Sequence, residues 1–245
     1  MSNAAYTRYE IIRAFRNRRF FIFSVAFPLI LFFVIAAPNR NEHDLGGSGI
    51  DAPLYFMVGL AAFGTMNAVL GTGARIAAER SLGWNRQLRL TPLTPQAYFR
   101  TKVLTAYLSA LLTIVLLYAA GASLGVRIEA GRWVEMTLLI LIGLIPFAGL
   151  GIVIGHLISI DSIGPAMGGI TAVLGLLGGV WYPIGGSGAM HDIAVSLPSY
   201  WLVQASHVAI GGGAWSATGW IVVGAWSVSA ALVAAWAYRR DTQRY

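Results

Sequence analysis

Histidine and acidic side chains are the residues of this chain that could catalyse a reaction or bind a metal. Two pairs are close in sequence, His156 with Asp161 and His191 with Asp192. The first pair could be a metal site or a proton relay, although a polar helix end is the interpretation we favour. The second could be hydrolytic, but no serine-centred elbow accompanies it, so we interpret it as a solvated turn. We therefore expect no catalytic residue and no metal site.

The sequence lacks the residues that nucleotide hydrolysis by a phosphate loop and thiol chemistry need. The only lysine, Lys102, has no glycine before it, so the phosphate-binding pattern G-x-x-x-x-G-K-[ST] is absent. Cysteine is also absent, which excludes disulfides, thiol catalysis and cysteine metal sites. The chain cannot hydrolyse ATP by the phosphate-loop route and binds no cofactor that we can predict.

The elements that carry these residues are apolar. The 245 residues are 57% hydrophobic and 11% charged, whereas a soluble domain is roughly 25% charged. Six apolar blocks each reach about the 20 residues that cross a bilayer. They are residues 20–37, 53–74, 103–126, 133–155, 162–183 and 214–238. This pattern predicts an all-α integral membrane protein with six transmembrane helices in a single domain, 1–245.

Ionisable side chains are almost absent from these blocks. Glu135 stands at the start of the fourth block and can reach the interface. Ion-coupled carriers normally need buried carboxylates. If the chain transports a substrate, we expect the energy to come from another chain.

Basic residues sort to one side of the predicted spans. Fourteen of the 17 Lys and Arg residues fall in the N-terminal flank, in the loop after the second span or at the C-terminus. The positive-inside rule therefore predicts a multi-pass protein of the plasma or inner membrane with both termini in the cytoplasm.

The N-terminal segment, residues 3–19, reads as an imperfect amphipathic helix. Its apolar arc consists of Ala5, Tyr9, Ile11, Ile12 and Phe15. Such a helix suits the membrane interface, with its arginines toward lipid phosphates. The alternative is a charged flank that only orients the first span.

The loop from Glu79 to Lys102 reads ERSLGWNRQLRLTPLTPQAYFRTK. It is basic and polar, lies on the cytoplasmic side and contains two Thr-Pro steps. It is either a solvated connector or a docking site for a soluble partner.

The segment between spans five and six, residues 184–213, is apolar and aromatic but too short to cross the bilayer. We predict helices that re-enter the outer leaflet. Its aromatic residues form either an interfacial belt or an outer gate. The gate candidates are Trp181, Tyr182, Pro183, Pro198, Tyr200 and Trp201.

The whole chain resembles the permease subunits of type-2 ABC transporters, particularly the daunorubicin-resistance-like exporters. Four features carry the resemblance. They are the basic helix before span one, the loop pattern E-R-x-x-G-x-x-x-x-L-x-x-x-P, the sequence GGVWYP that ends span five, and the segment LPSYWLVQA.

The resemblance implies a half-transporter that pairs with a second permease, identical or homologous. Two copies of a cytoplasmic ABC ATPase would carry ATP and Mg²⁺, and the N-terminal helix would touch them. A coupling helix, about 79–92, would dock on that ATPase. Its residues would be Glu79, Arg80, Gly83, Trp84, Arg86, Gln87, Leu88, Arg89, Leu90 and Thr91.

The resemblance also implies a substrate path along spans one, two and five, for hydrophobic drugs, antibiotics or lipids. The path residues that we nominate are Phe27, Phe56, Met57, Phe63, Met66, Asn67, Met167 and Leu174. For any one of them, ordinary packing or lipid contact is the simpler interpretation. The competing functions are an ion-coupled carrier and a membrane-embedded enzyme or assembly factor. We expect membrane lipids, but no nucleic acid, as partners.

Overall fold

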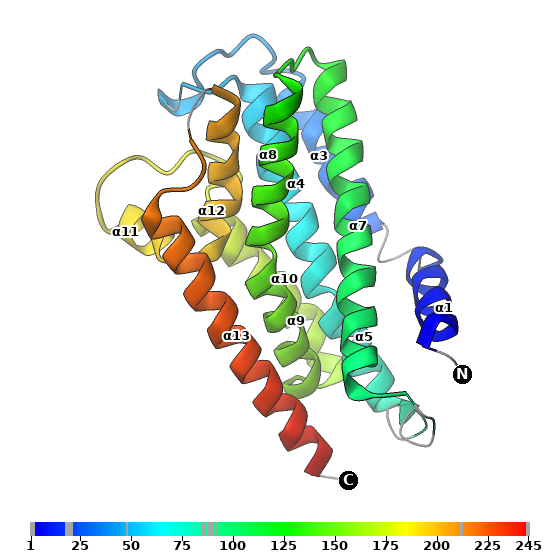
Figure 1. Ribbon diagram of the computed structural model, residues 1–245. Coiled ribbons are helices and arrows are strands. Elements are labelled where there is room, and N and C mark those ends of the chain that lie inside the picture. Colours follow the sequence, from blue (N-terminus) through cyan, green and yellow to red (C-terminus); the bar gives the residue numbers. More distant parts are fainter. Residues whose placement is uncertain are drawn as a thin grey trace.

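The computed structural model describes residues 3–17, 22–47, 49–84, 87, 91, 93–210 and 213–243, and these residues form helices but no strand. Long helices run side by side between two ends of the molecule (Figure 1). We call the end where α5 leads into α7 and where the C-terminus lies the base, and the opposite end the top. The elements are α1 (Asn3–Phe15), the π-helical turn η1 (Ile22–Ala26), α3 (Phe27–Ala36), η2 (Leu45–Gly47), α4 (Ala52–Leu70), α5 (Thr72–Ser81), α7 (Pro95–Ser123), α8 (Ala130–Gly143), α9 (Ile145–Leu157), α10 (Ile160–Leu177), α11 (Ala189–Val195), α12 (Pro198–Gln204), η3 (Ala205–Ile210) and α13 (Ala217–Gln243).

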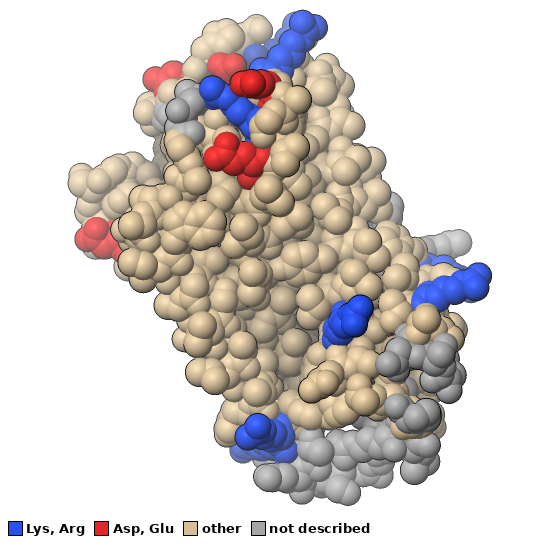
Figure 2. All heavy atoms as spheres, viewed as in Figure 1, with Lys and Arg blue, Asp and Glu red and all other residues tan. Residues whose placement is uncertain are grey.

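Five helices of the described chain are long and apolar enough to cross a membrane. They are Ala52–Ser81, Pro95–Ser123, Ala130–Leu157, Ile160–Leu177 and Ala217–Arg240. The predicted first span is present as a shorter apolar helix, Ser24–Ala36, and residues 18–21 before it lie outside the described part. Figure 2 shows an uncharged band between the charged ends, with the visible acidic side chains in the upper half.

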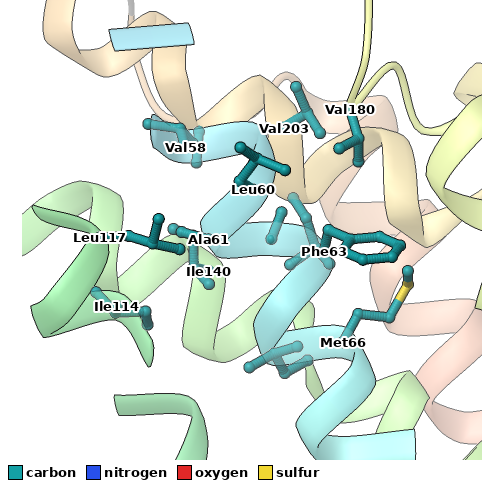
Figure 3. Packing of buried hydrophobic residues seen from close by; sticks show 14 of the residues in the cluster. Val58, Leu60, Ala61, Phe63, Met66, Ile114, Leu117, Ile140, Val180 and Val203 are labelled. Atoms are coloured by element: carbon teal, nitrogen blue, oxygen red, sulfur yellow. The ribbon is translucent and has the colours of Figure 1, made fainter. Parts of the chain in front are cut away.

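Helix α4 is the centre of the bundle. All of its residues except Asn67 are buried, because α3, α7, α9, α10 and α12 surround it. Ala61 faces Leu117 of α7, whereas Phe63 and Met66 point to another side (Figure 3). A helix that is apolar all round belongs in the interior, which explains why α4 holds the others in place.

Helices α5 and α9 cross with their backbones in contact. A Cβ atom on Gly73 would lie 2.4 Å from the carbonyl oxygen of Gly151, and one on Gly155 would lie 2.8 Å from the carbonyl oxygen of Gly73. Only glycine permits this approach. Gly151 and Gly155, which are separated by three residues and lie on one face of α9, therefore have a packing role here.

The second and third spans extend further toward the base than the sequence indicated. The second continues beyond Ala74 to Ser81, because no residue ends the helix before Gly83, whose φ is +69°. The third starts at Pro95, where Thr94 Oγ1 accepts the N–H of Ala97 at 3.2 Å. Threonine before proline is a helix start, so the assignment of Lys102 to a loop was wrong.

Hydroxyl groups line one buried face of α7. Thr105, Ser109 and Thr113 each donate to the carbonyl oxygen four residues earlier, at 2.8, 3.0 and 3.0 Å. Bonds of this kind satisfy polar side chains without a partner helix. Thr113 also lies 3.2 Å from the carbonyl oxygen of Ser24 in η1, so α7 meets the start of the first apolar helix.

Breaks in the later helices follow proline and glycine. The fourth span divides at Leu144 into α8 and α9, with Pro146 in the first turn of α9. Between α10 and α13 the chain forms the short helices α11 and α12, and α12 is buried against α4, α8 and α13. Short helices were predicted for this segment, and their re-entry into the outer leaflet stays a prediction.

Candidate functional site

A cluster of buried charges joins α1, α5 and α7 at the base. Lys102 is fully buried, and its Nζ lies 2.5 Å from Glu10 Oε1 and 2.5 Å from Glu79 Oε1. Arg13 donates to Glu79 Oε1 at 3.0 Å, and the Tyr98 hydroxyl donates to Glu79 Oε2 at 2.8 Å. We call these five residues the base cluster. Buried charges are tolerated when they are paired and hydrogen-bonded, so the cluster fixes three elements together.

Helix α1 turns Tyr6, Glu10 and Ala14 toward the bundle. Glu10 is 2% exposed, whereas Tyr9, Ile12 and Phe15 on the opposite face are 56, 46 and 40% exposed. The apolar arc predicted from the sequence is therefore the outward face. This orientation is unfavourable in water but suits an apolar surrounding beside the bundle.

Tyr6 packs beside the base cluster on the inner face of α1. Its ring lies 6.4 Å from that of Tyr98. Burial, and then the carboxylates of Glu10 and Glu79, raise the pKa of Tyr6 well above its usual value. Its hydroxyl is therefore uncharged at neutral pH and adds no negative charge to this region.

The sequence could have indicated the base cluster only weakly. Glu79 is the one acid among the basic residues 75–102, and Lys102 is the only lysine. An acid among basic residues is a charge that a positive-inside loop does not require, whereas Lys102 fits such a loop and therefore gave no signal. Their partner Glu10 is about seventy residues from Glu79, and no local pattern connects residues that far apart.

A cavity of about 790 Å³ lies above and beside the base cluster. Its walls come from α1, η1, α3, α4, α5 and α10. Along α4 and α5 the lining descends from Phe63 through Asn67 to Arg75 and Ala78. That stretch of helix is about 20 Å long at 1.5 Å per residue. The volume is within the roughly 300–1,000 Å³ of small-molecule sites.

The two ends of the cavity differ in polarity. Toward the top it is lined by Phe27 and Phe63, whose ring centres are 6.4 Å apart. The ring of Trp181 packs 5.4 Å from that of Phe63. Toward the base it is lined by Glu10, Arg13 and Arg75. This arrangement suits an amphipathic molecule better than an ion or a wholly polar solute.

Comparison with known proteins identifies the family. Residues 2–211 match the family described as "ABC-2 type transporter". The chain belongs to the ABC-2 type transporter family. It is also similar to a protein of Bacillus subtilis (strain 168) named "Putative transport permease YvfS", with 27% identity over 195 residues, which are 78% of each chain.

The chain is thus the transmembrane permease of an ABC-2 type transporter and a multi-pass membrane protein. Permeases of this family work with ABC ATPase subunits, which hold the ATP, and have no ATPase activity themselves. The sequence has no phosphate loop, which agrees with ATP binding by the ATPase subunit and not by the permease.

Four of the eight predicted path residues line the cavity of the permease. They are Phe27, Phe63, Asn67 and Met167. Phe56, Met57 and Met66 are instead buried in the core, each at most 5% exposed, and Leu174 packs against it. Met57 fills the space that glycine leaves at Gly121 of α7, so the Met57 side chain packs α4 against α7.

The predicted coupling residues divide into three groups. Glu79 belongs to the base cluster, and its side chain is 1% exposed. Arg80 donates to the carbonyl oxygens of Gly155 and Ile158, each at 3.2 Å, and to that of His156, so it covers the end of α9. Beyond the turn at Gly83, Trp84 and Gln87 are helical and exposed. Thr91 is half-buried, and Arg86, Leu88, Arg89 and Leu90 lie outside the described residues.

The predicted gate residues cluster near the top but differ in burial. Pro198, Tyr200 and Trp201 of α12 are buried, whereas Tyr182 is 62% exposed. Trp181 and Pro183 are half-buried. Burial raises the pKa of Tyr200. The Trp201 indole donates to the carbonyl oxygen of Val195 at 3.0 Å, which ties α12 to α11.

The two His–Asp pairs do not form compact sites. His156 is buried between the rings of Phe99 and Tyr238, while Asp161 is exposed. His191 packs against the ring of Tyr200, and Asp192 is exposed. The described residues contain no group of three or more His, Cys, Asp or Glu side chains that could hold a metal.

Proposed function

We propose that the permease is one half of an ATP-driven exporter that moves amphipathic molecules out of the cytoplasm or the inner leaflet. The cavity between α1, α3, α4, α5 and α10 carries this proposal. Its walls include the first, second and fifth apolar helices, on which the path was predicted, and four nominated residues line it. The six crossings would be the five long helices and the shorter helix Ser24–Ala36.

The base is the proposed side of the ATPase. Charge sorting supports a cytoplasmic base, because the end of α5 and the C-terminal end of α13, which adjoin basic stretches of the sequence, lie there. The docking surface would begin after Gly83, since Glu79 and Arg80 face the interior. Helix α1, which the base cluster joins to α5 and α7, would be the interfacial helix.

The segment between α3 and α4 supports the drug-exporter branch. It spans about fifteen residues, which leaves no room for a folded outer domain. Drugs, antibiotics and lipids are therefore the substrate classes that we propose. The short helices α11 and α12 would re-enter the outer leaflet at the exit.

A matched pair of glycine variants tests the docking site. Gly83 and Gly47 both have positive φ, +69° and +77°, but lie at the base and at the top. Proline cannot adopt such a φ, so either substitution disturbs its own turn. We expect Gly83→Pro to abolish both ATP-dependent efflux and copurification of the ATPase subunit, and Gly47→Pro to retain both.

The reversed charge at Arg86 provides a second variant that does not depend on the turn. We expect Arg86→Glu to weaken copurification of the ATPase subunit. Intact ATPase binding and efflux in both Gly83→Pro and Arg86→Glu would refute the coupling role of this segment.

A further inference from the structure

We propose that the cavity selects amphipathic molecules with an acidic head group, such as a phosphate, sulfonate or carboxylate. This inference rests on the proposed function, because it assigns a substrate class to the same cavity. It depends on the charges around the polar end and on the order in which polar and apolar walls follow each other.

The charges at the polar end do not balance. Two carboxylates, Glu10 and Glu79, are both bonded to Lys102, and Glu79 also accepts from Arg13. Arg75 lines the same end and donates to Thr72 Oγ1 at 3.1 Å. Among these described side chains, three cations stand against two carboxylates, an excess of one positive charge beside a largely apolar space.

Arg13 is the most exposed of the three cations, because Arg75 is half-buried. Lys102 is enclosed, with 0% side-chain exposure, whereas the side chain of Arg13 is 45% exposed. Arg13 therefore retains donors that a bound molecule can reach. A guanidinium group binds phosphate and carboxylate through paired N–H donors. A cationic head group would instead meet the excess positive charge, which repels it.

The apolar walls fix the orientation of the molecule. Phe63 lies further from the base than Arg75 along the continuous helix Ala52–Ser81, and Phe27 packs against Phe63. An acyl chain or an aromatic ring would occupy the upper part, with the acidic group at the base. The lipids of the leaflet at the base have this same orientation, so a molecule could enter from that leaflet without turning over.

Binding of tail-matched probes to the purified full-length permease in neutral detergent tests the proposal. The probes are 1-oleoyl lysophosphatidylglycerol, which is anionic, 1-oleoyl lysophosphatidylcholine, which is zwitterionic, and oleyltrimethylammonium, which is cationic. Native mass spectrometry reports the bound molecules. We expect the anionic probe to bind about ten- to a hundredfold more tightly than the other two, the range for one charge-assisted hydrogen bond.

Charge variants locate the selectivity. Arg13→Gln and Arg75→Gln each remove the excess charge, so we expect either to abolish most of the preference. Arg100→Gln is the control, because Arg100 is an exposed residue of α7 that does not line the cavity. If Arg75→Gln does not fold, Arg13→Gln decides alone. Equal binding of all three probes to the unchanged permease would overturn the proposal, as would a preference that survives both cavity variants.

A cavity-filling variant separates this inference from the proposed function. Gly168 lines the cavity, and a Cβ atom there would have no neighbour within 4 Å. Gly168→Leu should therefore reduce the binding of every probe that uses the cavity. Unchanged binding of all probes would refute the cavity as the substrate site. Reduced binding without any head-group preference would refute only the acidic selectivity.

Competition distinguishes the source of the acidic molecule. Naphthalene-2-sulfonate carries an acidic group on an aromatic ring without an acyl chain. Its displacement of the anionic probe would assign the cavity to acidic amphiphiles in general. Failure to displace it, together with the preference above, would assign the cavity to acidic lipids.

Discussion

At the scale of single residues, the base cluster depends most on Lys102. It is fully buried and is the shared partner of Glu10 and Glu79. Its loss would leave the two buried carboxylates with the partly exposed Arg13 as their salt-bridge partner. Removing one member of a buried ion pair usually costs more than the pair contributes, because the other charge remains without compensation.

We therefore predict that Lys102→Met lowers the free energy of unfolding by about 3–5 kcal/mol. Thermal unfolding of the purified permease in detergent measures the change. Arg100→Met, an exposed position of the same helix, should change stability by less than about 0.5 kcal/mol. Equal melting temperatures of the two variants would contradict the role that we assign to the base cluster.

The spans could be predicted from the sequence, whereas the base cluster could not. The all-helical fold and most spans followed from apolar blocks, because bilayer thickness imposes a length that composition reveals. Lys102 was assigned to a loop, because a charge next to an apolar block usually lies in water. Its burial depends on Glu10 and Glu79, which approach it only after α1 and α5 have packed.

At the scale of elements, the crossing of α5 and α9 is the tightest backbone contact that the described glycines show. Any side chain at Gly73 must push against the carbonyl group of Gly151, which cannot rotate away. Because α5 leads to the proposed docking segment, this contact also determines how that segment is held. The spacing Gly151-x3-Gly155 is typical of closely packed membrane helices, but Gly73 has no glycine three or four residues away, so the sequence does not identify it as the partner.

We predict that Gly73→Ala lowers the free energy of unfolding by about 1–3 kcal/mol, the usual cost of an overpacked contact. Gly224→Ala in α13 is the matched control, because a Cβ atom there has no neighbour within 4 Å. Alanine at this control position should be neutral or stabilising by up to about 1 kcal/mol. Both values come from the same thermal unfolding assay, and a tolerated Gly73→Ala would argue against the crossing.

At the scale of the whole molecule, α10 and α13 both have largely exposed faces, but they differ in the size of their residues. Gly169 of α10 has open space around it and does not line the cavity, whereas α13 exposes the large side chains of Trp220, Ile221 and Trp236. Small residues permit two helices to approach closely in a membrane. The outward face of α10 is therefore where we expect the second permease, while α13 would face lipid.

The absence of native cysteine makes this prediction directly testable. Val173 of α10 and Leu232 of α13 are 55% and 67% exposed, so each can be replaced by cysteine without disturbing the core. We expect oxidation of membranes to convert Val173→Cys to a covalent dimer and to leave Leu232→Cys monomeric, as gel electrophoresis without reductant would show. The opposite result would place the second permease at α13.

The hydroxyl ladder of α7 has a consequence for how the chain enters the membrane during synthesis. Thr105, Ser109 and Thr113 bond to carbonyl oxygens of their own helix. Helix α7 therefore brings its polar groups into lipid already satisfied and can insert before its neighbours arrive. Lys102 at its lower end cannot be satisfied in this way until α1 and α5 are in place. Helix α7 can therefore insert independently of the other helices. Lys102 is paired only after α1 and α5 have packed against α7, so we expect formation of the base cluster to be the last step of assembly.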